Sequence, residues 1–526
     1  MPQRKDKHLS QQTKRSLSVQ EPSESIHADH LIVVTNRGPV EYYVSQDKTL
    51  KHRRGAGGVV TALMGSVHDM DTTWVALAMT DGDRMALEQA HDGLLPSPLP
   101  NQQMQLRYVA VPKAVYRRSY DMISNQVLWF LQHYLLNQNE SSPTVEQIQD
   151  AWENGYIKAN QAIADAICAQ LGREQQATIV VMLHDYHLYL APAMIRVNHS
   201  QSSIIMEQFI HIPWPEVRYW QSSLPTTITQ AIFSGLLGND IIGFQTRRDA
   251  QNFLEGVAEV LDDVDIDVEH GAIHRQGRRT LVRDYPISIS VSEERRIVQS
   301  AASKHAAERI RPLLGEQTIM RVDRIELTKN IVQGFQAYEY MLEHHPELRG
   351  KVTFLAFLVP SRQTVPIYQK YKDEILKIIE DLNQKFGREG WKPIHAFVQN
   401  DRTEALAALQ FYDVLLVNAL IDGMNLVAKE GPVVNQRNGV LVLSRTSGAF
   451  QQLEKASLPI SPADTVETAE ALFQALTLSP DERRQKAELA RQEVESNDLG
   501  TWILQQIREI NHVLESQGGK RKQRLT

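Results

Sequence analysis

The amino-acid sequence predicts an α/β protein built from two doubly wound domains. The chain has 526 residues, more than one hydrophobic core usually organises. Short apolar runs rich in β-branched residues alternate with helical stretches, which is typical of parallel sheets covered by helices on both faces. These runs form two series, separated by a charged, serine-rich helix expected at 292–313. We therefore expect two domains joined near residue 290.

The first series of expected strands lies in the N-terminal half. Runs such as LIVVT and TIVVML are short, almost wholly apolar and bounded by polar residues, as buried parallel strands are. The strands are expected at 31–35, 73–79, 106–112, 178–183, 204–210 and 240–244, with helices at 145–171, 186–198 and 246–260.

The second series repeats this pattern in the C-terminal half, beginning with TIMRV and VTFLAFLV. Longer polar stretches between the runs have the length of helices. The strands are expected at 318–322, 352–359, 394–399, 413–418 and 439–444, with helices near 330–345, 365–387, 402–411 and 424–434.

The domain limits follow from these two series. We expect an N-terminal domain at 29–290 and a C-terminal domain at 291–480, followed by helices at 481–516 that could pack back on the N-terminal domain. The polar segments 1–28 and 517–526 are expected to be disordered arms. The first has no apolar core, which argues against a secretory signal, and a disordered arm is favoured over an organelle transit peptide.

Composition narrows the class of protein. A hydrophobic fraction of 42% with 23% charged residues is typical of a soluble globular protein. The net charge of −7 argues against a nucleic-acid partner, and no apolar run is long enough to span a membrane. The single cysteine, Cys168, excludes an intramolecular disulfide and fits a reducing compartment, so we expect a cytoplasmic protein with small-molecule partners. Homo-oligomerisation stays open.

Ligands of doubly wound sheets bind beyond the carboxyl ends of the strands, and unusual residues occur there in the first half. Arg37 directly follows the first expected strand. The stretch RRGAGGVV then places Gly57 and Gly58 before an apolar helix start, where backbone N–H groups could approach an anion. A tight turn is the favoured interpretation of these glycines taken alone.

Two further strand ends in this half carry histidines. HDYH follows TIVVML, but its two histidines lack a third ligand at a metal-site spacing, which favours a polar cluster around Asp185. His211 opens HIPWP, where two prolines fix the loop. It is either a core histidine or a site residue.

In the second half, DRIELTKN places Arg324 and Lys329 past the first strand and at a helix start. A planar guanidinium and a point charge at such a place suit a diphosphate. The alternative is a solvated loop in which Arg324 pairs with Glu326. Arg362 follows the next strand in the same way.

The stretch VNALIDGMNLVAKEG interrupts an apolar run with polar residues. Asp422 ends a strand, Gly423 permits a turn, and Glu430 lies about one turn inside the following helix. Both carboxylates can accept hydrogen bonds from sugar hydroxyls. Backbone N–H groups at the helix start could cradle a phosphate, and they belong to Met424, Asn425 and Leu426.

Two other signals are weaker. The acidic run 261–269 contains Asp-x-Asp, a metal-chelating pattern, but a solvated connection is favoured because no clear strand precedes it. Tyr120 and Trp129 lie in YDMISNQVLWFLQHY, where such aromatic residues are either core or caps on a sugar ring.

Taken together, these stretches resemble the trehalose-6-phosphate synthase family over about residues 30–512. NRGPV, GAGG, YDMISNQVLW, HDYHL, HIPWP, GFQT, DRIELTKN, PSR and DGMNLVAKE occur in the family's order. The resemblance implies a retaining glucosyltransferase of GT-B architecture, in which two Rossmann-like domains face each other across a cleft.

The resemblance also implies roles for individual residues. The matching acceptor-binding residues are Arg37, Tyr120, Trp129, Asp185 and Arg362. The matching donor-binding residues are Gly57, Gly58, Arg324, Lys329, Asp422, Gly423, Met424, Asn425, Leu426 and Glu430. Those nearest the chemistry are His211, Asp185, Arg324 and Lys329, and neither a metal nor a cofactor is implied.

The reaction implied is transfer of glucose from a nucleotide diphosphate sugar to glucose 6-phosphate, giving trehalose 6-phosphate, a compatible-solute precursor. UDP-glucose is the expected donor, with ADP-glucose and GDP-glucose open. The chain departs from the family's pattern at Leu327, at Asn330, at 419–421 and in lacking a Gly-Trp-Ser-Gly loop. These departures leave two alternatives, a glucosylglycerol-phosphate synthase using glycerol 3-phosphate and a non-catalytic sugar-phosphate-binding regulator.

Overall fold

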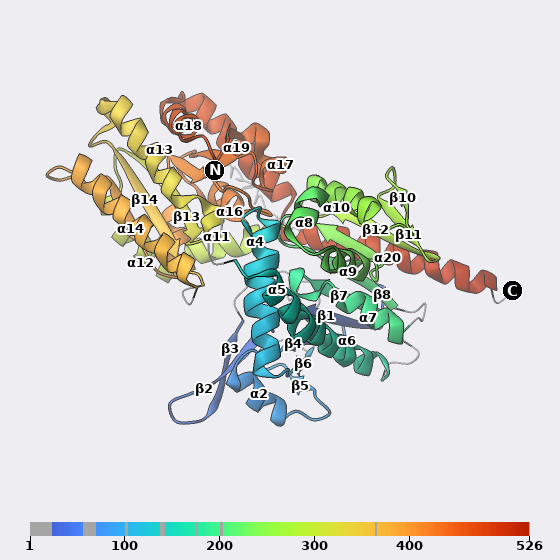
Figure 1. Cartoon of the computed structure of the whole chain (residues 1–526). Helices are drawn as coiled ribbons and strands as arrows, with labels where there is room; N and C mark the ends of the chain where they lie inside the picture. The colour runs from blue at the N-terminus through green and yellow to red at the C-terminus, as the bar shows by residue number, and fades with distance from the viewer. Residues whose placement is uncertain are drawn as a thin grey trace, which may run out of the picture.

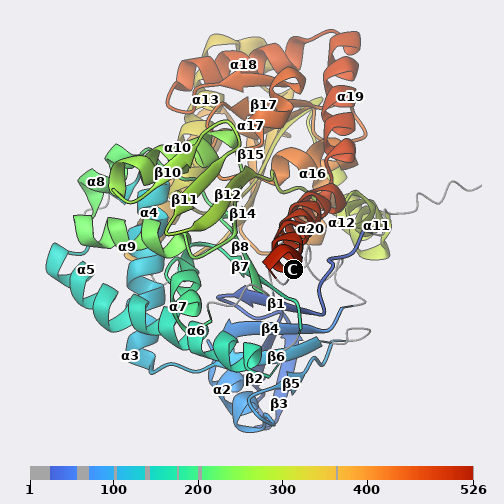
Figure 2. The same cartoon turned by 90° about the vertical axis from the view of Figure 1, so that its right-hand side faces the viewer.

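The chain forms two α/β domains, each built on its own sheet (Figures 1 and 2). The computed structural model describes residues 24–55, 70–99, 104–136, 142–173, 177–199, 204–362 and 365–524. Among these residues no helix is both long and apolar enough to cross a membrane, and no group of three potential metal ligands comes together.

The N-terminal sheet has ten strands in the order β10-β11-β12-β9-β8-β7-β1-β4-β6-β5. All pairings from β12 to β6 are parallel, and the antiparallel strands lie at the two edges. The strands are β1 (His30–Thr35), β4 (Thr72–Leu77), β5 (Leu95–Pro96), β6 (Met104–Val109), β7 (Ile179–His184), β8 (Ile204–Phe209), β9 (Ile241–Phe244), β10 (Asp265–Asp267), β11 (Ala272–Arg275) and β12 (Arg278–Asp284).

The six strands predicted in this half all form. The acidic run 261–269, predicted to be a connection, instead contributes edge strand β10, which pairs with β11. A separate antiparallel hairpin of β2 (Val40–Val44) and β3 (Leu50–Arg54) extends from the domain (Figure 1). The first of these strands, VEYYV, is interrupted by a glutamate, and the second, LKHRR, is mostly basic, so neither has the continuous apolar run that marked the buried strands.

Helices cover both faces of this sheet. One continuous rod runs through α3 (Lys113–Tyr116), the π-helical segment η1 (Arg117–Leu128) and α4 (Trp129–Gln132) (Figure 1). Its Trp129 contacts Tyr368 of the C-terminal domain, with ring centroids 6.4 Å apart. The remaining helices are α2 (Asp81–Glu88), α5 (Val145–Ala151), η3 (Trp152–Tyr156), α6 (Ile157–Leu171), η4 (Tyr186–Leu188), α7 (Ala191–Asn198), α8 (Val217–Ser223), α9 (Thr226–Leu236) and α10 (Arg247–Val260).

The C-terminal sheet is wholly parallel, with the order β15-β14-β13-β16-β17-β18. In chain order this is 3-2-1-4-5-6, the doubly wound arrangement of dinucleotide-binding domains. The strands are β13 (Gln317–Arg324), β14 (Val352–Val359), β15 (Ile394–Phe397), β16 (Val414–Val417), β17 (Val440–Ser444) and β18 (Ser457–Ile460).

Helices again cover both faces of the second sheet. The helix predicted at 292–313 is divided, because Ser300 ends α11 and caps α12 through the backbone N–H of Ser303. The helices are α11 (Val291–Gln299), α12 (Ala301–Ile310), η5 (Arg311–Leu313), η6 (Leu327–Lys329), α13 (Ile331–His344), η7 (Pro346–Leu348), α14 (Pro366–Phe386), α15 (Arg402–Leu409), α16 (Val427–Val434), α17 (Phe450–Leu453), η8 (Glu454–Ala456), α18 (Thr465–Thr477), α19 (Pro480–Ser496) and α20 (Leu499–Arg524).

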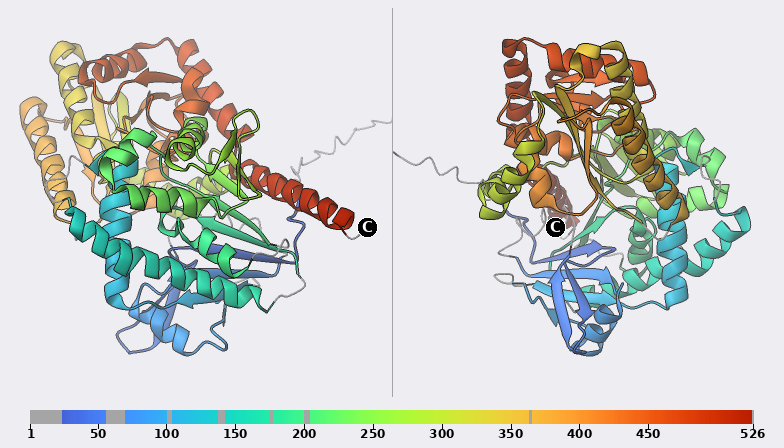
Figure 3. Two further views of the ribbon diagram at one scale, coloured as in Figure 1. Left: turned by 45° about the vertical axis from the view of Figure 1, so that its right-hand side comes forward. Right: turned by 90° about the vertical axis from the view of Figure 1, so that its left-hand side faces the viewer.

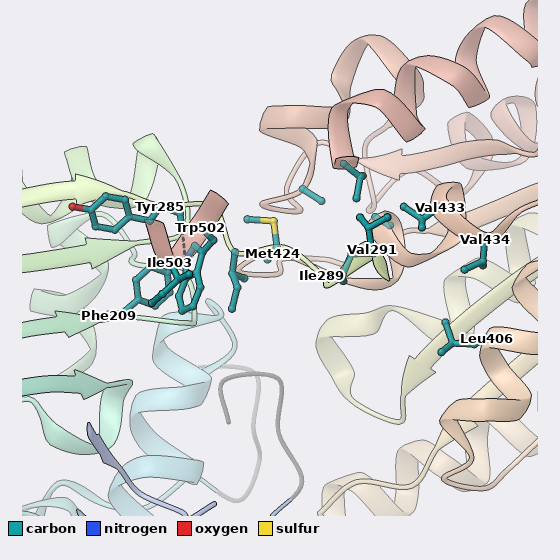
Figure 4. Packing of buried hydrophobic residues seen from close by; sticks show 14 of the residues in the cluster. Phe209, Tyr285, Ile289, Val291, Leu406, Met424, Val433, Val434, Trp502 and Ile503 are labelled. Atoms are coloured by element: carbon teal, nitrogen blue, oxygen red, sulfur yellow. Dashed lines mark hydrogen bonds between the residues drawn. The ribbon is translucent and has the colours of Figure 1, made fainter. Parts of the chain in front are cut away.

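The chain passes between the domains twice, at 285–290 and at 497–499. Of the two last helices, α19 stays with α16 in the C-terminal domain, whereas α20 returns to β8 of the N-terminal domain (Figures 2 and 3). The buried Trp502 of α20 packs edge-on against Phe209, with ring centroids 5.3 Å apart, and its Nε1 donates to the Tyr285 carbonyl at 3.1 Å. Figure 4 shows these apolar side chains between the two domains.

The predicted arms differ from the structure at both ends. Residues 24–28 are packed on α20: Ile26 is buried, the His27 N–H donates to Asn511 Oδ1 at 2.8 Å, and Asn511 Nδ2 donates to the Ser25 carbonyl at 3.0 Å. The prediction of disorder was therefore wrong for these residues, while 1–23 lie outside the described part. At the other end, α20 continues to Arg524, past residue 517, where the second arm was predicted to begin.

Candidate active site

The topological switch points of the two sheets face each other. In the N-terminal sheet the strand order reverses between β1 and β7, which end next to Arg37 and Asp185. In the C-terminal sheet it reverses between β13 and β16, which are followed by Lys329 and Asp422. Since crevices open at such points, both loop sets contribute to one cleft.

Two overlapping cavities form this cleft. The larger, of about 900 Å³, is lined by residues of both domains, including Arg37, Tyr120, Asp185, His211, Arg324 and Arg362. The smaller, of about 250 Å³, shares several of these residues and adds Trp129, His133, Lys329, Asp422 and Gly423. The strand ends flagged in the sequence are therefore brought together.

Asp185 occupies a strained position at the centre of the cleft. Its φ of 74° lies in the left-handed region, which is costly for a residue other than glycine. The end of β8 holds it there, because the Asp185 N–H donates to the Phe209 carbonyl at 2.8 Å and Gln208 Nε2 donates to the Asp185 carbonyl at 3.1 Å. Burial raises the pKa of Asp185 to about 7.

His211 is a cavity residue, although its ring is largely enclosed. Its backbone N–H reaches Asp185 Oδ1 at 3.4 Å, and its Nε2 lies 3.3 Å from Nδ1 of His184. Burial, followed by repulsion from His184, lowers the pKa of His211 well below 6.5. The imidazole is therefore neutral at physiological pH and can exchange hydrogen bonds with a sugar without carrying charge.

Aromatic rings line the side of the cleft reached by the rod α3-η1-α4. Tyr120 stacks on His187 with centroids 5.7 Å apart, and the Arg362 guanidinium lies over the Trp129 ring, 4.2 Å from its centroid. Stacking on Trp129 fixes the plane of the Arg362 fork and leaves its edges available to an anion. Arg37, which is exposed, faces the same cavity.

The cations of the C-terminal switch point are paired with carboxylates. Arg324 Nη1 and Arg362 Nη1 lie 3.1 and 3.2 Å from Oε1 of Glu326, and Lys329 forms an ion pair with Asp422. Burial opposes the charge on Lys329, but Asp422 and Asp323 together outweigh burial and raise the pKa of the lysine. The Arg324–Glu326 pair that the sequence offered as an alternative does form, at the cleft.

The Asp422 loop brings the C-terminal domain against His211. A Cβ atom at Gly423 would clash with the His211 carbonyl oxygen, so glycine is required for this approach. Asn425, with a φ of 75°, donates to Asp422 Oδ2 at 3.1 Å and accepts from the Ala428 N–H at 3.2 Å. The helix predicted to open at Met424 begins at Val427 instead, and the Met424 side chain is buried between the domains.

One predicted donor residue, Glu430, stands apart from this arrangement. Glu430 lines neither cavity; it lies on α16, 3.8 Å from Arg402, and burial raises its pKa. Gly57 and Gly58 lie outside the described residues. The sequence also gave no role to Ser361 and His187, which line the larger cavity, although each lies inside a motif that had been singled out.

The chain has two doubly wound domains whose switch points face each other, and the switch point of the C-terminal domain is rich in cations. These features define a GT-B glycosyltransferase. More narrowly, the chain belongs to glycosyltransferase family 20, whose sequence model matches residues 29–512. The resemblance found in the motifs is thereby confirmed.

Relatives support this membership. The chain is 32% identical over 489 residues to a bifunctional trehalose-6-phosphate synthase/phosphatase of Thermoproteus tenax, covering 90% of this chain but 62% of the relative. It is 30% identical over 467 residues to a UDP-forming α,α-trehalose-phosphate synthase of Yarrowia lipolytica, covering 86% of this chain and 93% of the relative. The chain thus spans less than two thirds of the first of these proteins.

Solved structures agree with the fold. A trehalose-6-phosphate structure from E. coli bound with UDP-2-fluoro glucose has a TM-score of 0.76 at 26% identity, covering 92% of this chain and 99% of that one. A UDP-forming α,α-trehalose-phosphate synthase from Burkholderia xenovorans in complex with glucose-6-phosphate has a TM-score of 0.74 at 26% identity, covering 91% and 99%.

Proposed function

We propose that the protein transfers glucose from UDP-glucose to glucose 6-phosphate with retention, forming trehalose 6-phosphate. The observation that carries the proposal is one cleft that is lined by cations from both domains. Arg324 and Lys329 belong to one domain's switch point, while Arg37 faces them from the other. The ligands named in the related structures, a UDP-glucose analogue and glucose-6-phosphate, support a donor on one side and a phosphorylated acceptor on the other.

Arg324 and Lys329 would hold the donor diphosphate and stabilise the charge that develops on it as the glycosidic bond breaks. Their present carboxylate partners keep both cations in the cleft before substrate arrives. Asp422 would accept hydrogen bonds from hydroxyls of the transferred glucose. Because these cations supply positive charge at the leaving group, the proposal needs neither a metal nor a cofactor.

On the acceptor side, Arg37, Tyr120, Trp129 and Arg362 would bind the phosphate and the sugar ring. Asp185 would hold an acceptor hydroxyl and His211 a donor hydroxyl near the reacting carbon. We propose front-face substitution, in which the departing phosphate oxygen accepts the acceptor's proton. The alternative mechanism has Asp185 or Asp422 acting as a nucleophile. If removing either carboxylate leaves turnover unchanged, that carboxylate is not the nucleophile.

The deciding experiment crosses three donors with two acceptors. UDP-, ADP- and GDP-glucose are each incubated with glucose 6-phosphate and with glycerol 3-phosphate, and NMR identifies the product and its anomeric configuration. UDP-glucose with glucose 6-phosphate is expected to give an α,α-linked disaccharide phosphate. A product only with glycerol 3-phosphate would replace the proposed acceptor, and tight binding with no turnover of any pair would point to a regulator.

We also place the reaction in the cytoplasm, because the single cysteine fits a reducing compartment. The product would serve there as a precursor of a compatible solute.

A further inference from the structure

We infer that Glu326 is a positioning residue shared by the donor and acceptor sites, orienting Arg324 and Arg362 together. The inference rests on the proposed function, which assigns these two arginines to different substrates. It gives a role to the carboxylate in the middle of DRIELTKN.

Three groups converge on one oxygen of Glu326. Its Oε1 accepts hydrogen bonds from Arg362 Nη1 at 3.2 Å and from Ser361 Oγ at 3.0 Å, and it forms an ion pair with Arg324 Nη1 at 3.1 Å. The Glu326 side chain is 1% exposed, so water does not screen these contacts as it does at a surface ion pair. Arg324 is the last residue of β13, Arg362 follows the neighbouring strand β14, and both guanidinium groups contact this carboxylate.

Backbone hydrogen bonds hold the segment that carries Glu326. The Ile325 N–H donates to the Val359 carbonyl at 2.8 Å, the Glu326 N–H to the Arg324 carbonyl at 2.8 Å, and the Lys329 N–H to the Glu326 carbonyl at 3.0 Å. By contrast, the Arg324 side chain is 57% exposed. A fixed carboxylate therefore orients a long side chain that would otherwise sample many rotamers.

The contacts leave the arginines able to bind substrate. Each guanidinium uses Nη1 toward Glu326, and the remaining N–H groups of the planar fork can meet a phosphate. Glu326 itself stays ionised: burial opposes its charge, but the neighbouring cations, Arg324 first, outweigh burial and lower its pKa. Glu326 thus orients both arginines without competing with a substrate phosphate for them. Loss of Glu326 should therefore weaken the binding of both substrates.

The test measures both Michaelis constants in Glu326→Ala and Glu326→Gln. Glu326→Ala is expected to raise KM for UDP-glucose and for glucose 6-phosphate by about tenfold each, because Arg324 loses its ion pair and Arg362 loses a charge-assisted hydrogen bond. Glu326→Gln keeps an oxygen acceptor at the same place and should recover part of both losses. It also keeps the test decisive if the alanine variant fails to fold.

Asp413→Asn is the matched control. Asp413 is a buried carboxylate that also holds two arginines, Arg437 at 3.1 Å and Arg483 at 2.9 Å, but next to the opposite end of the same sheet. Losing this pairing should lower stability and leave both KM values unchanged. A general folding defect would reduce the active fraction, and hence apparent kcat, without raising either KM.

A double-mutant comparison sharpens the result. In an Arg362→Ala background, Glu326→Ala should no longer change KM for glucose 6-phosphate but should still raise KM for UDP-glucose. If Glu326→Ala raises only one KM, or lowers both, the shared positioning role is refuted while the proposed function stands. If the parent protein turns over neither substrate, the proposed function falls and the inference falls with it.

Discussion

Lys429 offers a prediction whose sign follows from the structure. Its side chain is buried on α16, and its Nζ donates to the Ile287 carbonyl at 2.7 Å and to Gln452 Oε1 at 2.6 Å. Ile287 belongs to the first segment that passes between the domains. Burial lowers the pKa of Lys429 to about 7, and Glu493 offsets this only in part.

The magnitude comes from proton linkage. Between pH 7 and 10.5 the unfolded chain holds the proton on this lysine and the folded protein does not, so stability rises with pH across that window. Each tenfold difference in proton affinity is worth about 1.4 kcal/mol, so the gap from 10.5 to about 7 corresponds to roughly 4 to 5 kcal/mol. Lys429→Met removes the titrating group and should remove this rise.

Urea unfolding of the parent and of Lys429→Met at pH 7, 8, 9 and 10 tests the reasoning. The difference in unfolding free energy, parent minus variant, should grow with pH; other titrating groups cancel because both proteins contain them. Lys385→Met is the control, since hydrogen bonds from Lys385 to Glu339 and Glu343 raise its pKa at the surface. If the difference in unfolding free energy between the parent and Lys429→Met does not change from pH 7 to 10, the argument is refuted.

Three further predictions concern the cleft and the domain contact. Arg324→Ala should weaken UDP binding by roughly tenfold to a hundredfold, since a charge-assisted hydrogen bond is worth about 1.5 to 3 kcal/mol; unchanged affinity by calorimetry would remove Arg324 from the donor site. Arg37→Ala should raise KM for glucose 6-phosphate while sparing UDP-glucose, and steady-state kinetics with each substrate varied would expose an error if the donor KM moved instead. Trp502→Ala should lower unfolding free energy by about 3 to 5 kcal/mol, because it empties a buried site and leaves the Tyr285 carbonyl without its donor; denaturant titration showing less than 1 kcal/mol would contradict this packing argument.

The sequence located most of the cleft because one rule applies to every parallel strand. Residues that follow such strands lie at one edge of the sheet, so Arg37, Asp185, Arg324, Arg362 and Asp422 could be grouped without knowing the strand order. Their grouping into a single cleft needed only that the two sheets face each other.

Other features depend on contacts between elements that no local pattern encodes. Glu430 has a partner from α15, Arg402, which no pattern around Glu430 in the sequence reveals. The shared role of Glu326 requires β13 and β14 to be neighbours, which their spacing in the chain does not reveal. The docking of Ile26 on α20 joins the two ends of the chain and could not be read from either end alone.

The two interdomain passages are tied to each other, since the Leu499 N–H donates to the Ile289 carbonyl at 2.9 Å while Trp502 bonds Tyr285. These two linked segments together form the hinge between the domains. The domains can rotate about an axis that passes through both segments. Twisting one domain against the other would break the Leu499–Ile289 and Trp502–Tyr285 hydrogen bonds. Domain closure over two substrates would therefore follow a single rotation. That rotation would bring Arg37 and Arg324 to the same separation in each catalytic cycle.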